Sequence, residues 1–204
     1  MGQTGGMTRS FEGHIAGLGT ASGTRIVVGM WDVSPFGTFA DAMVEDPSGH
    51  RILIAPRQDV ADFVASTYSF DEVRIEPVSV ETGDEWSVHT RSLQVRFTPG
   101  GRVWVSPLLR LVPGLLRRSS WWARLCNPVA GLLMPGVRTY GSAGGGRSEW
   151  YAATGVRKLS HARATWQGDE LGTLARVTPP VRFGFASSPA QPTLTALTSY
   201  VAEA

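Results

Sequence analysis

The sequence has few of the residues on which metal, redox and lysine chemistry depend. Its 204 residues include one cysteine, Cys126, so no disulfide can form within the chain. The four histidines lie far apart, and together with one cysteine they spell out no local metal site. Eighteen of the nineteen cationic residues are arginine, which we read as the codon bias of a high-GC genome, and Lys158 is the only lysine. Lysine chemistry therefore has one candidate, and we expect neither a metal nor another cofactor.

Long apolar runs and targeting signals are also missing. Arginine interrupts the longest apolar stretch before it reaches the roughly 18 residues that a membrane span needs, so we expect no transmembrane segment. The N-terminus has no cationic stretch followed by an apolar one, and this, with the lone cysteine, favours a cytoplasmic protein. The net charge of +2 indicates no dense basic patch, and we therefore expect no nucleic acid partner.

What remains is the composition of one globular domain. Hydrophobic residues make up 42% of the chain and charged residues 18%, a balance that can build a core. Chains of this length commonly fold around a single core. We expect residues 1–10 to be disordered, because they have little to bury, and residues 11–204 to form a single β-barrel-like domain with a helical insertion at 106–136.

Alternating apolar residues predict strands on both sides of that insertion. From Arg25 onward strand-like segments follow one another, and DPSG at 46–49 has the residues of a hairpin turn. Side chains expected to face the core include Val73, Ile75, Val88 and Val95. The predicted strands cover 26–31, 39–45, 51–56, 72–81, 85–90, 92–98, 149–159, 161–166, 170–177 and 193–201. The fold is therefore expected to be mainly β, an antiparallel closed barrel or strongly curved sheet.

Apolar residues recur at helical spacing in two segments of the chain. Apolar residues including Val60, Phe63 and Val64 predict one amphipathic helix near 57–68. Within 106–136 apolar residues recur every three to four positions between arginines, and three prolines divide the stretch, so short helices are predicted there. The segment GSAGGGRS at 141–148 is read as a flexible linker.

The stretch WDVSPFGTFAD, residues 31–41, is the best candidate for a pocket wall. Its SPFG turn joins two predicted strands and places Phe39 and Asp41 on one face. At this point the sequence resembles the acetoacetate decarboxylase-like superfamily, whose members carry a similar strand, a Ser/Pro-x-Gly turn, an aromatic residue two positions after the glycine and an acidic residue two further on. Gly37, Phe39 and Asp41 stand at those positions, with Asp where the family pattern has Glu. The resemblance covers residues 25–56.

The resemblance implies a closed antiparallel β structure around an apolar pocket, in which a lysine forms a Schiff base with a β-keto acid. No lysine lies between the motif and the helical insertion, where the family would supply it, and Lys158 is expected on a strand facing solvent. The resemblance therefore supports a pocket for an apolar or carboxylate-bearing small molecule more than it supports decarboxylation. Phe36, Gly37 and Phe39 would belong to the wall that contacts this ligand.

Three further side chains are candidates for the chemistry of such a pocket. In an apolar wall, desolvation would raise the pKa of Asp41 and let it act as a proton donor, whereas at the rim it would only hydrogen-bond the turn. His161 lies on a predicted strand and could act as an acid or base if it faces the interior; the alternative is a structural histidine. Arg182, among prolines and aromatic residues, could bind a ligand carboxylate or lie exposed on the surface.

The segment LLRRSSWWARLC at 115–126 suggests another class of function. Two tryptophans among arginines are typical of an interfacial helix, a partner-docking helix or a lid over an apolar cavity, and ordinary packing on the barrel is the plain alternative. The competing hypotheses are a small-molecule pocket protein, a non-catalytic protein that docks a partner or membrane surface through residues 106–136, and an acid–base enzyme that uses Asp41 and His161. Assembly into a homo-oligomer, with the number of copies left open, is a further expectation.

Overall fold

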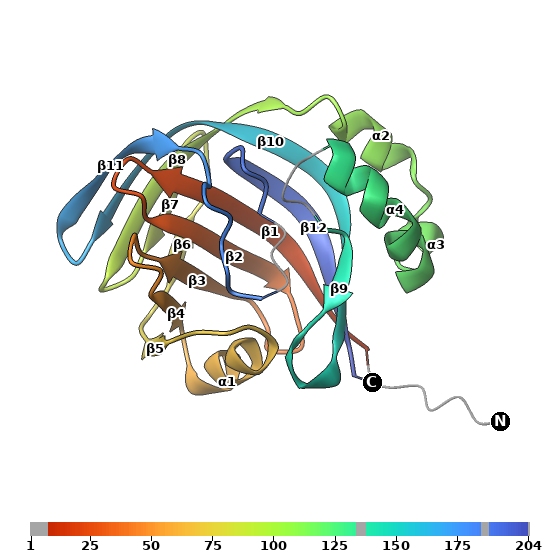
Figure 1. The fold of residues 1–204 in the computed structure, drawn as a ribbon, viewed down its shortest axis with the longest axis horizontal. Helices are drawn as coiled ribbons and strands as arrows, with labels where there is room; N and C mark the ends of the chain where they lie inside the picture. The colour runs from red at the N-terminus through yellow and green to blue at the C-terminus, as the bar shows by residue number, and fades with distance from the viewer. Residues whose placement is uncertain (1–7, 134–137, 185–187, 204) are drawn as a thin grey trace.

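A computed structural model describes residues 8–133, 138–184 and 188–203 (Figure 1). Its strands are β1 (Thr8–Thr20), β2 (Arg25–Val33), β3 (Phe39–Glu45), β4 (Arg51–Ala55), β5 (Glu72–Ile75), β6 (Ser79–Glu81), β7 (Trp86–His89), β8 (Leu93–Arg102), β9 (Tyr140–Ser142), β10 (Ser148–Trp166), β11 (Asp169–Ala175) and β12 (Thr193–Ala202). Its helices are α1 (Gln58–Thr67), α2 (Ser106–Leu111), α3 (Gly114–Arg117), α4 (Ser120–Leu133) and the short 3-10 helix η1 (Gly144–Gly146). The predicted fold class is confirmed, including the helix near 57–68 and the short helices within 106–136.

The described strands form one sheet that curls until part of it closes. Ten of the strands follow the order β5-β4-β3-β2-β1-β11-β10-β8-β7-β6. β12 pairs with both β1 and β10, so that β1, β12, β10 and β11 make a closed ring of antiparallel strands. β10 has nineteen residues, enough to pair with β12 along its first part and with β8 and β11 along its last part. Figure 1 shows it arching from β9 to β11 and carrying β8 over the face of β1 to β4.

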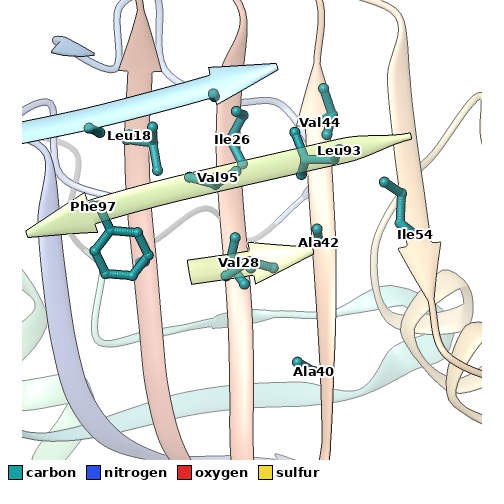
Figure 2. Close-up of a cluster of buried hydrophobic side chains, with 14 of the residues drawn as sticks. Leu18, Ile26, Val28, Ala40, Ala42, Val44, Ile54, Leu93, Val95 and Phe97 are labelled. Atoms are coloured by element: carbon teal, nitrogen blue, oxygen red, sulfur yellow. The ribbon is translucent and has the colours of Figure 1, made fainter. Parts of the chain in front are cut away.

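Strands β1 to β4 are buried on both faces. Even-numbered side chains such as Val28 and Ala42 pack against Val95 and Phe97 of β8, which crosses over them (Figure 2). Odd-numbered side chains such as Phe39 point the other way, into a second cluster that α1 covers. The odd-numbered face is the one that borders the cavities described below.

β1 was not predicted as a strand. It begins at Thr8, so residues 8–10 belong to a strand and not to the disordered terminus that we expected; residues 1–7 lie outside the described residues. Glycines break the apolar alternation of β1 because neighbouring chain comes close. A Cβ at Gly13 would collide with the backbone of Met30, and one at Gly19 with the backbone of Arg176.

The segment read as a flexible linker is a β-hairpin, so that prediction was wrong. β9 pairs with the first residues of β10, and η1 forms the turn between them. Gly144 packs against the end of α1, where a Cβ would collide with the carbonyl oxygen of Ser66. The Nη1 of Arg147 donates to Ser66 Oγ at 2.7 Å, and its guanidinium lies over the ring of Phe63. Close packing explains Gly144, and the positive φ values of Gly145 and Gly146 in the turn favour glycine at those two positions.

The core positions predicted for 72–81 were also wrong. Val73 and Ile75 are exposed, whereas Val88 and Val95 are buried as expected. β5 lies at the edge of the sheet and pairs only with β4, in parallel, after the crossover through α1. An edge strand of this kind has no second layer over its outward side chains.

In the described part of the chain, no helix is both long enough and apolar enough to cross a lipid bilayer. The longest, α4, has fourteen residues.

Candidate ligand-binding cavity

An inner cavity of about 70 Å³ lies between the odd-numbered face of β1 to β3, helix α1 and the segment 177–184. Its wall is mainly aromatic and aliphatic, and it includes Phe11, Trp31, Phe39, Phe63, Val181 and Phe183. Two carboxyl side chains also line it, Asp41 from β3 and Glu149 from β10. Carboxyl groups in so apolar a wall have little solvation, and their protonation therefore depends on their few partners.

Asp41 has one bonded and one unbonded carboxylate oxygen. The indole Nε1 of Trp31 donates to its Oδ1 at 3.1 Å, while Oδ2 has no hydrogen-bond partner among the described residues. The residue is only 2% exposed. Burial raises the pKa of Asp41 to about 7, and the bond from Trp31 opposes that rise. Near neutral pH this group can therefore either donate or accept a proton.

Gly29 makes room for this arrangement. It stands opposite Asp41 in the β2–β3 ladder. A Cβ at position 29 would lie 2.6 Å from Asp41 Oδ1 and 2.7 Å from Trp31 Nε1. A side chain larger than hydrogen would therefore displace the Trp31–Asp41 pair from the cavity wall.

The carboxylate of Glu149 has more hydrogen-bond partners than that of Asp41. The hydroxyl of Tyr68 lies 2.8 and 2.7 Å from its two oxygens, and Ser199 Oγ donates to Oε1 at 2.9 Å. Burial raises the pKa of Glu149, and the bonds from Tyr68 and Ser199 oppose the rise. Burial, followed by the nearby charge of Glu149, raises the pKa of Tyr68 well above its ordinary value. Glu149 therefore holds β10, β12 and the end of α1 together at one side of the cavity.

Ser188 is the second polar group of this cavity that has no partner in the described part of the chain. Its Oγ is buried, lines the inner cavity and makes no hydrogen bond to any described residue. Gly17 of β1 leaves the space that this hydroxyl occupies, since a Cβ there would collide with it. Two polar atoms that bond to no described residue, Asp41 Oδ2 and Ser188 Oγ, therefore line one small apolar cavity.

An outer cavity of about 480 Å³ adjoins the inner one under helices α2 to α4. The two cavities share three wall residues, Ile15, Tyr151 and Ser188. Its other walls are mostly apolar, from Val105, Leu108, Leu109, Val112, Trp122 and Leu125 on the insertion and from Ala152, Val156 and Leu197 on the sheet. The site thus has a small end with two carboxyl groups and a larger, mostly apolar end that Arg117 and Arg138 also line.

Four of the residues singled out in the sequence belong to the turn after β2 and to β3. Phe39 and Asp41 line the inner cavity on one face of β3. Phe36 does not line it; its ring stacks on Phe11 and lies tilted against Phe63 beside the wall. Gly37 is exposed in the turn, with a φ of 76° that favours glycine. The turn therefore fixes the wall from outside the cavity.

The structure does not bring His161 and Arg182 together with Asp41. His161 is exposed on β10, and Lys158 on the same strand is also exposed. Arg182 is held by a carboxylate of the protein itself: its backbone N–H donates to Glu45 Oε2 at 2.8 Å and its Nε to Oε1 at 2.9 Å. Its side chain is 66% exposed and lines neither cavity. It fastens the segment that carries Val181 and Phe183 into the wall.

The sequence reading missed Tyr68, Glu149, Tyr151, Ser188 and Ser199. One signal was present, because Glu149 and Tyr151 stand two residues apart on a predicted strand and so share a face. Ser188 gave no signal, since it lies in a Pro- and Ser-rich segment without periodicity.

The fold and the site together define a β protein with a mostly apolar cavity. Within residues 8–133, 138–184 and 188–203, no cluster of three or more His, Cys, Asp or Glu side chains could hold a metal ion. No protein-family model, curated protein or solved structure matches the chain.

Proposed function

We propose that the chain binds a small apolar molecule carrying one uncharged polar group, with that group in the inner cavity and the apolar body in the outer one. The observation that carries this proposal is the pair of unbonded atoms, Asp41 Oδ2 and Ser188 Oγ, in one apolar cavity. Each buried polar atom without a partner costs about 1–3 kcal/mol, so a ligand group that bonds to both would remove that cost. The outer cavity, at about 480 Å³, falls within the range of roughly 300–1,000 Å³ that small-molecule sites occupy.

The charges around the inner cavity favour an uncharged ligand group over a carboxylate. No described Arg, Lys or His lines this cavity, whereas two carboxyl side chains do. A ligand carboxylate would meet Asp41 and Glu149 without a compensating cation, which is costly in an apolar wall. A ketone or ester carbonyl could instead accept a hydrogen bond from protonated Asp41, and a hydroxyl could donate to its ionised form.

Kinship with the acetoacetate decarboxylase-like superfamily is part of this proposal. Its support is the SPFG turn together with Phe39 and Asp41 in the cavity wall. Schiff-base chemistry is not proposed, because Lys158 is the only lysine and is exposed on β10. The cytoplasmic location indicated by the sequence also belongs to the proposal.

Displacement of a fluorescent apolar probe, N-phenyl-1-naphthylamine, tests this function. Decane, 2-decanone, 1-decanol and decanoate differ only in the polar group at one end. We expect the ketone and the alcohol to displace the probe at lower concentrations than either the alkane or the carboxylate. In Asp41→Ala that advantage should fall by roughly ten-fold, the equivalent of one buried hydrogen bond.

The matched control is Asp32→Ala, which removes an exposed carboxylate from the same stretch of sequence. This variant should leave unchanged both the order in which the four compounds displace the probe and the advantage of the ketone and the alcohol. Equal displacement by decane and 2-decanone, or an advantage that survives in Asp41→Ala, would contradict the proposed site.

A further inference from the structure

The helical insertion lies in a long stretch of sequence without acidic residues. Residues 86–148 contain nine arginines and no Asp or Glu, whereas the rest of the chain has ten cationic residues against seventeen acidic ones. The net charge of +2 is therefore the sum of a strongly basic segment, residues 86–148, and a net acidic rest of the chain. No arginine of this segment forms a salt bridge with a described residue.

The same insertion exposes most of the large apolar side chains on the surface. Nine such side chains are exposed in the described chain, and six of them lie at 104–125: Trp104, Leu108, Leu111, Leu115, Trp121 and Leu125. Leu111 and Leu115 are 77% and 85% exposed. Figure 1 shows α2, α3 and α4 gathered at one side of the molecule, away from α1 and the β5 edge. Apolar and cationic side chains therefore share one protruding surface.

We infer that helices α2 to α4 dock on the surface of an anionic lipid bilayer. Short amphipathic helices with Trp and Leu among arginines bind at the level of the headgroups, where the apolar side chains enter the acyl boundary and the guanidinium groups meet lipid phosphates. Exposed Arg118 lies three residues before Trp121, and exposed Arg124 directly precedes Leu125, so this segment can make both kinds of contact together.

A second copy of the chain fits this surface poorly. A two-fold symmetric contact would place the same patch on both sides, and each patch is basic with no acidic residue to answer the other. An anionic bilayer supplies negative headgroups for the arginines of this surface and an apolar interior for its exposed Leu and Trp side chains.

The docking surface is also the outer wall of the outer cavity. Leu108 and Leu125 line that cavity and are both more than half exposed. If the proposed function holds, a ligand with an apolar body could pass between the acyl layer and the cavity beneath α2 and α4. The docking itself does not depend on that ligand.

Co-sedimentation with phospholipid vesicles tests the inference on the full chain. We expect the protein to bind vesicles of phosphatidylcholine mixed with phosphatidylglycerol, to bind pure phosphatidylcholine much more weakly, and to be released at high salt. Leu111→Ser combined with Leu115→Ser should weaken binding at least ten-fold. Val33→Ser, which removes an exposed apolar side chain from β2, is the matched control and should bind as the wild type does.

A second pair of variants separates local charge from total charge. Arg118→Glu and Arg163→Glu change the net charge equally at exposed positions, but only Arg118 lies in the insertion. We expect Arg118→Glu to lose most of the binding and Arg163→Glu to retain it, with far-UV circular dichroism showing that both are folded.

Absence of binding to every vesicle, or equal losses in Arg118→Glu and Arg163→Glu, would overturn the inference. So would a dimer in analytical ultracentrifugation that dissociates in the leucine variant while no vesicle binds, since the patch would then join two copies. These outcomes would leave the cavity proposal intact, because probe displacement is measured without lipid.

Discussion

Asp41 Oδ1 accepts a hydrogen bond from Trp31, while Oδ2 borders an apolar cavity. A solvated carboxyl at this position would lose its proton well below neutral pH. Burial in β3 instead brings its pKa to about 7. Small local changes, such as a ligand carbonyl at Oδ2, can therefore decide whether the group is charged.

The stability of the protein should depend on pH through Asp41. Its pKa is about 7 when folded and 3.8 when solvated, so between these values the folded state binds more protons than the unfolded state. The free energy of unfolding then falls as pH rises from about 4 to about 7 and levels off above that range. The difference between the two pKa values corresponds to on the order of 4 kcal/mol.

Asp41→Asn should remove that part of the pH dependence, and urea unfolding at a series of pH values measures it. The raised pKa of Glu149 gives a slope of the same sign, but it is common to both proteins and cancels in the difference. If wild type and variant run parallel across this range, the pKa of Asp41 is the same in the folded and the unfolded protein.

Part of the site was predictable at the scale of single residues. Strand alternation alone places Phe39 and Asp41 on one face, and the apolar residues around them predict that the face is buried. Strand alternation could not place Arg182, because its partner Glu45 is 137 positions away and only the fold brings the two together. It could not orient His161 either, since β10 curves and carries register shifts between Leu159 and His161.

At the scale of elements, one buried carboxylate joins three parts of the chain. Glu45 of β3 is fully buried, pairs with Arg25 of β2 at 3.0 Å and holds Arg182 of the segment 177–184. The guanidinium of Arg25 is also buried, and its Nε has no hydrogen-bond partner among the described residues.

Glu45→Ala should therefore destabilise the protein by about 3–5 kcal/mol, because it leaves the charge of Arg25 buried without its carboxylate. Chemical denaturation measures the loss. Glu203→Ala breaks the more exposed pair with Arg9 and should cost at most about 1 kcal/mol. Equal small losses in the two variants would mean that Arg25 is solvated or finds another partner.

Regular strands were the most predictable elements, and strands rich in glycine the least. β2, β3 and β4 alternate or run apolar over their whole length, and turn residues separate β3 from β4. β1 reads as irregular because Gly13, Gly17 and Gly19 replace side chains for which its neighbours leave no room. In the hairpin at 141–148 the same reason holds for Gly144, whereas Gly145 and Gly146 have the positive φ values of a turn. The sequence shows where a glycine stands, but it does not show which residues of the folded chain pack against that glycine.

At the scale of the whole molecule, the insertion is an addition to one side of the curled sheet. Val103 N–H donates to Val156 and Tyr151 N–H donates to Thr139, so both ends of the insertion are anchored on β10, roughly 17 Å apart along the strand.

A flexible linker of about eight residues could span that distance in place of residues 104–138. We expect this variant to keep its strand signal in circular dichroism and a cooperative unfolding transition, with lower stability, because the sheet wall of the outer cavity becomes exposed. It should no longer enhance the fluorescence of the apolar probe. A chain that loses its strand signal would instead make the insertion part of the folding core.

The net charge of the whole chain did not reveal how the charges are distributed along it. A net charge of +2 led us to expect no basic patch, yet every acidic residue lies outside 86–148. The insertion is basic because its counter-charges are elsewhere in the chain, and an average over 204 residues removes that contrast.

The pairing of β1 with β12 affects how the chain folds during its synthesis. Thr8 stands opposite Ala202, so a ladder at the middle of the sheet joins segments at the two ends of the sequence. Closing so long a loop costs entropy before any contact repays it, which slows folding. Until β12 has left the ribosome, β1 and β10 lack the strand between them, and the backbone N–H and C=O groups that would pair with β12 stay without those partners. The ring of β1, β12, β10 and β11 can therefore close only after the whole of β12 has been synthesised and released from the ribosome.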